Sequence, residues 1–317
     1  MRQERFEQAH RADWAAFEAM LGADRTAPGA DQLPQAYRQV CRHLALARDR
    51  CYTAGLVQYL NRLVMAGHQT LYGSTLGMGR PWARFLAGGL ARQVRALIRP
   101  VLLAALLLAL PTAVLPLAIA HDPQLAYLVE SPQDLARMEA MYRPGVGHFG
   151  RVNQAQTDVA MFGFYIWNNV RISFQAFAGG IFLGLGSIFF LLYNGLHGGA
   201  VAGHLAHAGL GPQFWPFVAT HSALELPALV LAGAAGLHLG WALLAPGQRS
   251  RARALAEATR EGMPLVYGAA LMDGLAACIE AFWSANGLVS ASLKLTAAAV
   301  LWSAMAGYFL LAGRSHD

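Results

Sequence analysis

The stretch Thr220-His221-Ser222-Ala223-Leu224-Glu225-Leu226-Pro227 places an imidazole and a carboxylate four residues apart inside an apolar segment. A helix brings residues at this spacing to one face, so we expect His221 and Glu225 to be neighbours. Ionisable side chains inside a membrane are costly and need a partner or a function. Pro227 lacks a backbone donor and predicts a break or kink just after the pair. A further acid, Glu280, lies in another apolar segment, and we expect it to approach the pair.

The composition around this stretch is that of an integral membrane protein. Of the 317 residues, 56% are hydrophobic and 13% are charged, and the mean hydropathy is +0.35. Soluble proteins carry about 25% charged residues. We therefore predict an all-α polytopic membrane protein with two parts. Residues 1–99 form a cytoplasmic amphipathic helical region, and residues 100–317 form a membrane domain with an external loop over 121–160.

The net charge of +6 comes almost wholly from arginines beside the apolar segments, where they indicate topology rather than nucleic-acid binding. The arginines of 84–99 precede the first apolar segment and favour a cytoplasmic N-terminus. We predict a multi-pass membrane protein with the lipid bilayer as partner and no nucleic acid; the family resemblance described below implies the bacterial cytoplasmic (inner) membrane. Hydrophobic residues at helical spacing predict amphipathic helices over 2–21 and 34–72, packed on each other.

Two models of the membrane crossings stay open. Five apolar blocks crossing once each would place the arginines of 249–260 outside, against the positive-inside tendency. The preferred model has four spans and a re-entrant hairpin, in which the block 205–244 turns back at Pro227. Both termini and the arginines of 249–260 would then be cytoplasmic. In both models the block 161–201, although long, crosses once.

The polar residues of the apolar blocks are predicted to gather in one intramembrane cluster. Its members are Asn168, Asn169, Asn194, His221, Glu225 and Glu280. Such a cluster suits a hydrogen-bonded core that fixes the helices, a path for a cation or proton, or a metal site. The chain lacks the His-Glu-x-x-His spacing of a zinc site and the Gly-x-Ser-x-Gly elbow of a serine nucleophile. We therefore predict no enzyme activity, no cofactor and no metal.

Four motifs of the membrane part occur in the same order as in a known family. They are Asn168-Asn169, Tyr193-Asn194-Gly195, His221-x-x-x-Glu225-Leu226 and Ile279-Glu280-Ala281-Phe282. With Tyr37-Arg38 and Leu44-x-x-Ala47-Arg48 in the polar region, the chain resembles the stage II sporulation protein M family of bacterial membrane proteins. One departure is Thr220-His221-Ser222, where that family commonly has Pro-His-Gly.

The resemblance implies a scaffold or assembly factor for envelope or peptidoglycan-remodelling partners. The intramembrane acids leave a different class open, a permease- or channel-like protein that moves a cation, a proton or a small solute. Ion flux in liposomes separates the two, because a scaffold shows none. Small residues at Gly180/Gly184 and Gly195/Gly199/Gly203 predict close helix packing within the chain and, as a further expectation, a homodimer.

Overall fold

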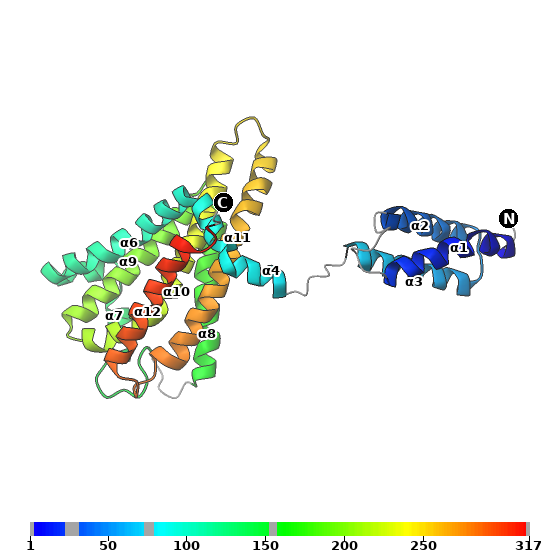
Figure 1. Cartoon of the computed structure of the whole chain (residues 1–317). Coiled ribbons are helices and arrows are strands. Elements are labelled where there is room, and N and C mark those ends of the chain that lie inside the picture. Colours follow the sequence, from blue (N-terminus) through cyan, green and yellow to red (C-terminus); the bar gives the residue numbers. More distant parts are fainter. Residues whose placement is uncertain (1–2, 23–31, 73–78, 152–156, 315–317) are drawn as a thin grey trace. The chain divides into compact units, whose positions relative to one another are not determined.

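The structure is a computed structural model that describes residues 3–22, 32–72, 79–151 and 157–314. These residues form helices, and their one β-type contact is an isolated bridge between His148 and Asn286. The chain divides into two compact units, Met1–Ala83 and Arg84–Asp317 (Figure 1). The second unit thus begins before residue 100, the predicted start of the membrane domain.

The first unit is a bundle of three helices with its own hydrophobic core. It contains α1 (Gln3–Gly22), α2 (Leu33–Asp49) and α3 (Ala54–Tyr72). Phe6, Phe17 and Leu60 are at most 2% exposed and lie at its centre. The single helix predicted over 34–72 is wrong, because the chain turns between α2 and α3, where Cys51 takes a φ of 50°.

The second unit is a helical bundle. Its entry segment and outer segments are α4 (Gly79–Arg84), η2 (Phe85–Gly89), α5 (Leu90–Ala96), η3 (Pro123–Leu128) and α7 (Pro132–Met141). Its long helices and the short turns within them are α6 (Ile98–His121), α8 (Asp158–Ala178), η4 (Gly179–Ile181), α9 (Leu185–His207), α10 (Gly211–Leu244), α11 (Arg251–Ile279), η5 (Glu280–Ser284) and α12 (Ala291–Leu311).

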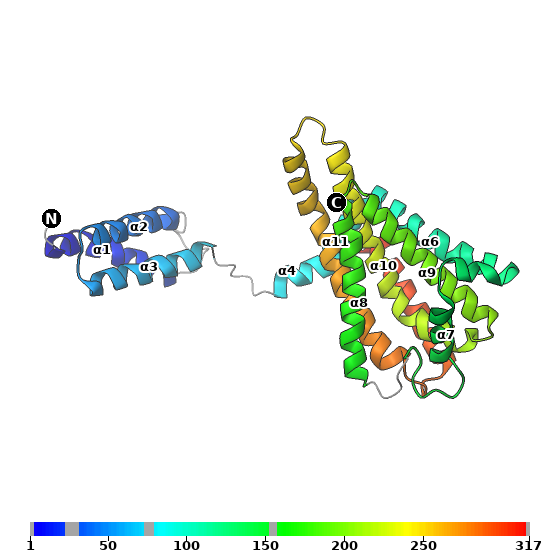
Figure 2. The same ribbon diagram turned by 180° about the vertical axis from the view of Figure 1, so that it is seen from behind.

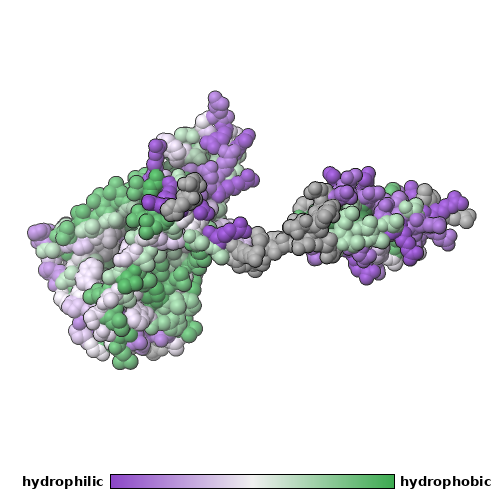
Figure 3. All heavy atoms as spheres, viewed as in Figure 1, coloured by the Kyte–Doolittle hydropathy of each residue, from purple (hydrophilic) through white to green (hydrophobic). Residues whose placement is uncertain are grey.

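Helix α10 is the centre of this bundle, and it packs against α6, α8, α9, α11 and α12 (Figures 1 and 2). Five helices of the described chain are long and apolar enough to cross a membrane: α6, α9, α10, α11 together with η5, and α12. Hydrophobic residues cover much of the visible surface of the unit (Figure 3). This confirms the predicted fold class, an all-α polytopic membrane protein.

The re-entrant turn predicted at Pro227 is wrong, because α10 is one helix of 34 residues that runs through this residue. A proline removes one N–H, but the rest of the ladder holds where neighbouring helices enclose the segment. Helices on all sides of α10 provide that enclosure. The His221 and Glu225 pair therefore lies in mid-helix rather than at a hairpin tip.

The block 161–201 contains two helices rather than one. Helices α8 and α9 are joined by a tight turn in which Leu183 and Gly184 both have positive φ, 57° and 86°. Gly184 suits this conformation because it has no Cβ. The chain thus has one more long helix than the predicted count of apolar blocks.

The ends of the long helices gather at two opposite ends of the bundle. At one end, called the arginine end here, Arg95 donates hydrogen bonds to the carbonyls of Phe309 (2.9 Å) and Ala312 (2.7 Å), while Gln93 donates to that of Glu261 (2.7 Å). At the other, the loop end, the Phe149 amide donates to the Ala285 carbonyl at 3.1 Å. The start of α6, the loop after α10 and the end of α12 therefore belong to the arginine end.

The glycines proposed as contact faces are occupied within the chain. A Cβ on Gly195 or Gly199 would meet the backbone of α6 at 2.5 and 2.8 Å, and one on Gly180 would meet Gly236 at 2.1 Å. The glycines thus allow close packing of helices within the chain, as the sequence predicts. Because these faces are already covered, they no longer support the predicted homodimer.

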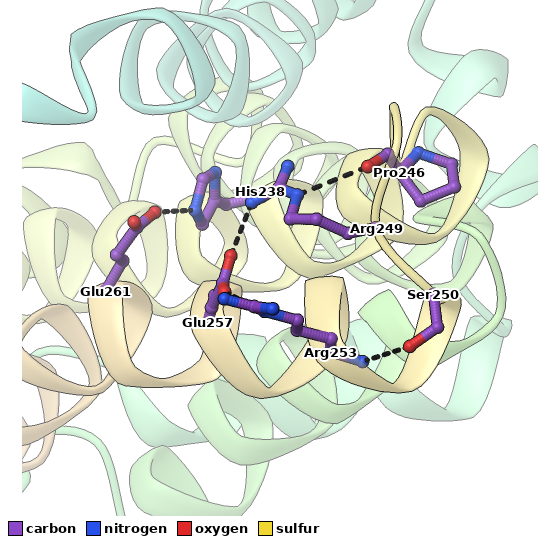
Figure 4. A network of polar contacts seen from close by, with 7 residues as sticks. All are labelled: His238, Pro246, Arg249, Ser250, Arg253, Glu257 and Glu261. Atoms are coloured by element: carbon purple, nitrogen blue, oxygen red, sulfur yellow. Dashed lines mark hydrogen bonds and ion pairs between the residues drawn. The ribbon is translucent and has the colours of Figure 1, made fainter.

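The α10–α11 hairpin carries a polar network at its tip (Figure 4). Glu257 accepts hydrogen bonds from Arg249 at 2.6 Å and from Arg253 at 2.9 Å. His238 pairs with Glu261 at 2.9 Å across the two helices. The tip is therefore charged, in contrast to the apolar surface of the rest of the hairpin.

Candidate functional site

His221, Glu225 and Glu280 meet at the centre of the membrane unit. One ligand atom of each lies within 4.8 Å of those of the other two. The spacing of four residues on α10 holds His221 Nε2 3.9 Å from a Glu225 oxygen, and His221 Nδ1 lies 3.1 Å from the hydroxyl of Ser284. The packing of α11 on α10 brings Glu280 to the pair.

Glu280 opens a π-helical turn, η5, which ends at Ser284. Such turns leave backbone carbonyls outside the regular ladder and are frequent at functional sites. Two buried cations satisfy these carbonyls. Lys294 Nζ donates to Ser284 O at 2.7 Å and to Asn286 O at 2.8 Å, and Arg151 donates to Ala281 O at 3.3 Å. Both cations hold the turn and leave the carboxylate of Glu280 free to face the cavity.

The three residues line a cavity of about 470 Å³ inside the bundle. Its further polar lining includes Thr112, Tyr142, Asn169, Ser173, Asn194, His197, Ser222 and Asp273. Glu225 is 33% exposed, whereas His221 is 5% exposed. Because helices surround α10, the exposed part of Glu225 faces this cavity and is the part of the cluster that a ligand can reach.

Asp273 adds a third carboxylate to the cavity wall. Its side chain is 0% exposed, and neither of its oxygens makes a hydrogen bond of good geometry to a described residue. The Ser173 hydroxyl lies near enough to interact with it, but outside that geometry. Buried polar groups are nearly always hydrogen-bonded, so the incomplete hydrogen bonding of this acid is unusual.

The charge of the cavity wall is unbalanced. Glu225, Glu280 and Asp273 contribute three acids, while the nearby cations Lys294 and Arg151 bind backbone carbonyls, and Arg151 also pairs with Asp158. Burial and, next, the charge of Glu280 raise the pKa of Tyr142 well above its ordinary range, so its phenol stays protonated at the loop end of the cavity. The site therefore favours a positively charged occupant or a shared proton.

The side chains of the cluster also resemble two other kinds of site, a metal site and a nucleophilic catalytic site. One imidazole nitrogen and two carboxylate oxygens form a donor set that Zn²⁺ accepts. Ser284, His221 and Glu225 also follow one another as in a nucleophile arrangement, but Ser284 is 0% exposed and no substrate can reach it. The expectations of no metal and no enzyme activity stay predictions.

The structure brings together most of the predicted cluster. Asn169 and Asn194 line the cavity with His221, Glu225 and Glu280. Asn168 does not line it, and it donates to the Asn169 side chain at 3.3 Å. Sequence reasoning missed Asp273, although it is an acid inside an apolar segment, the same signal that identified Glu280.

Comparisons with known proteins extend over most of the chain. The family model of stage II sporulation protein M matches residues 100–285, and a model described as a domain of unknown function matches residues 4–73. No curated protein and no solved structure matches the chain. The first match covers more than half of the sequence and contains all six residues of the predicted cluster. It confirms the resemblance: the chain belongs to the stage II sporulation protein M family.

Proposed function

We propose that the protein is a permease-like membrane protein whose cavity receives a cation or a small cationic solute. The observation that carries this proposal is the cavity of about 470 Å³ with three acids on its wall. Ionisable residues buried in membrane helices mark substrate or ion pathways. Asp273 adds a further buried acid to the wall, and the Ser173 hydroxyl is the polar group beside it.

The proposed orientation has six crossings in the bacterial inner membrane. Helix α8, with 21 residues, joins the five apolar helices as a crossing. An even number returns the C-terminus to the side of the arginines at 84–99, and it places the arginines of 249–260 there too. This satisfies the positive-inside tendency that five crossings violate, with the N-terminus cytoplasmic.

Uptake of radiolabelled methylammonium into proteoliposomes tests the proposal. We expect uptake above that of protein-free liposomes, and its loss in the double variant Glu225→Gln, Glu280→Gln. The amides keep the volume and most of the hydrogen-bonding capacity of the acids. Glu261→Gln is the matched control, because this exposed acid pairs with His238 away from the cavity. Equal uptake by the double variant and the parent protein contradicts the proposal.

A second candidate, a scaffold for envelope or peptidoglycan-remodelling partners, rests on the first unit. Met1–Ala83 has its own buried core and its own family match, so it is suited to hold a partner independently of the cavity. The family name, which refers to sporulation, supports a role in the envelope. Suppose that the double Gln variant supports every cellular function of the parent protein and that deletion of residues 3–72 abolishes these functions. This result would support the scaffold and contradict the permease.

A further inference from the structure

An apolar groove runs along the outside of the membrane unit between α6 and α12. It encloses about 480 Å³ over α10, and its wall is formed almost entirely of hydrophobic side chains. Helices α6 and α12 both pack on α10 but make few contacts with each other. The neighbouring side chains Leu102, Leu106 and Val300 are more than half exposed, which identifies this surface as one that faces lipid.

The groove adjoins the polar cavity. Leu108, Thr112, Leu226 and Trp302 line both spaces. The indole of Trp302 donates to the carbonyl of Ala219 at 3.3 Å, so the ring is held where the two spaces meet. An acidic cavity and a groove of hydrocarbon side chains therefore lie side by side.

We propose that the cationic ligand of the cavity is a membrane amphiphile, whose protonated amine head group lies at Glu225 and Glu280 and whose hydrocarbon chain lies in the groove. This inference rests on the proposed function and names its ligand class. Glu225, whose side chain is 33% exposed, supplies the carboxylate that the head group can reach. An anionic head group is excluded by like charge.

The dimensions of the groove suit one hydrocarbon chain. Its lining on α6 extends from Ile98 to Ala113, and 15 residues of helix rise about 22 Å. This length exceeds the roughly 15 Å that one leaflet contributes, so one extended chain fits within the groove. Val94 and Phe309 place the far end of the groove toward the arginine end, while Tyr142 places the cavity toward the loop end. The ligand therefore directs its head group toward the loop end and its chain toward the arginine end.

Photolabelling of the full chain in phosphatidylcholine nanodiscs tests this inference. The probe is a twelve-carbon primary amine with a diazirine in mid-chain, and the matching alcohol is the comparison. We expect the amine to label α6, α10 and α12 at the groove, in competition with excess dodecylamine but not with dodecanol. Labelling falls at least about tenfold in the Glu225→Gln, Glu280→Gln variant, because charged hydrogen bonds contribute about 1.5–3 kcal/mol each.

A variant that fills the groove distinguishes the contribution of the hydrocarbon chain to binding from that of the head group. Val230→Trp is expected to reduce labelling by the long amine and to leave the binding of butylamine unchanged, since Val230 lines the groove but not the cavity. Leu106→Trp is the control, because Leu106 is 57% exposed and lines neither space. Circular dichroism and size exclusion check that both variants fold.

The outcomes distinguish this inference from the proposed function. If butylamine binds in a carboxylate-dependent way and a longer chain adds nothing, the cation site stands and the amphiphile is wrong. If the alcohol labels the groove as strongly as the amine, the groove is an ordinary lipid-facing surface and the inference is overturned. If neither amine binds, both proposals fail together.

Discussion

Asp273 differs from Glu225 because its burial is complete and only weakly compensated. Glu225 is partly exposed to the cavity, whereas Asp273 is completely buried beside the Ser173 hydroxyl, without a hydrogen bond of good geometry to the described residues. An uncompensated buried charge lowers stability. Residues that lower stability in this way are retained where function needs them.

Replacing Asp273 by Asn should therefore stabilise the protein while it weakens the site. The amide remains a buried polar group but cannot ionise, so we expect the stability to rise by about 1 kcal/mol. We expect a higher melting temperature in detergent together with reduced methylammonium uptake. A lower melting temperature would show that Asp273 has a structural partner.

His43 gives the first unit a dependence on pH. Trp14 Nε1 donates to His43 Nδ1 at 3.0 Å, and burial, followed by the nearby His10, lowers the pKa of His43 below its ordinary value. The folded state thus prefers the neutral ring. The unfolded chain binds the proton first, below about pH 6.5, so stability is complete above that pH and is lost as the pH falls through the lowered pKa.

Hydrogen exchange of the full chain at pH 7 and pH 5 checks this expectation. After correction for the intrinsic rate, peptides of α1 and α2 should exchange faster at pH 5, because the protonated ring can no longer accept from Trp14. In His43→Gln, which cannot take up a proton, the difference between the two pH values should shrink. Equal protection of the parent protein at both values contradicts the role of His43.

At the scale of elements, the turn η5 depends on a cation from another helix. Lys294 on α12 is 2% exposed and binds two carbonyls at the end of η5. Lys294→Met leaves these carbonyls without a donor. Each lost charged hydrogen bond costs about 1.5–3 kcal/mol. We expect a lower melting temperature for this variant and a smaller loss for Lys294→Arg, which keeps the charge and can donate to both carbonyls.

The packing of α8 and α9 on α10 depends on the absence of a side chain at Gly236. A Cβ there would lie 2.2 Å from Ser187 Oγ and 2.6 Å from the Ala176 carbonyl. Gly236→Ala should therefore lower the melting temperature, because the helices must move apart. The control is Gly274→Ala on α11, where a Cβ would meet nothing within 4 Å. This control should be neutral or stabilising by about 0.5–1 kcal/mol.

The elements show which features the sequence makes predictable. The long apolar helices follow from hydropathy alone, but the turn between α8 and α9 lies in an apolar stretch without proline or charge, so hydropathy could not divide it. Its cause is backbone conformation at Leu183 and Gly184. Helix α7 was predictable: Ser131 caps it by accepting from the amide of Asp134, a local signal that the description of this region as a loop overlooked.

The candidate site is predictable to a similar degree. Ionisable residues in apolar blocks indicated His221, Glu225 and Glu280, because their desolvation is costly wherever the helices lie. The roles of Ser284 and Lys294 depend on contacts between helices that are distant in sequence. Those contacts follow from the packing of the bundle, which periodicity does not determine.

For the whole molecule, the six-crossing orientation predicts which positions an impermeant thiol reagent reaches. Single cysteines are introduced into a variant in which Cys41, Cys51 and Cys278 are serine. In intact cells, Leu288→Cys should be labelled, because it is 96% exposed at the loop end. Gln248→Cys should be labelled only after permeabilisation.

Phe182→Cys decides whether α8 crosses the membrane. This residue is 70% exposed in the turn between α8 and α9 and lies on the cytoplasmic side in the six-crossing orientation. It should be protected in intact cells, as Gln248→Cys is. Labelling of either position from outside would contradict the orientation.

The α10–α11 hairpin connects its charged tip to the cavity through two continuous helices. The tip network of Arg249, Arg253 and Glu257 lies on the same pair of helices as the cavity acids Glu225 and Glu280. Arg249 follows Glu225 by 24 residues, of which 19 belong to α10, so the arm is about 29 Å long. A tilt of about 5° at the cavity displaces the tip by about 2.5 Å over such an arm. A displacement of the charged tip is therefore expected to reach the carboxylates through the helix itself.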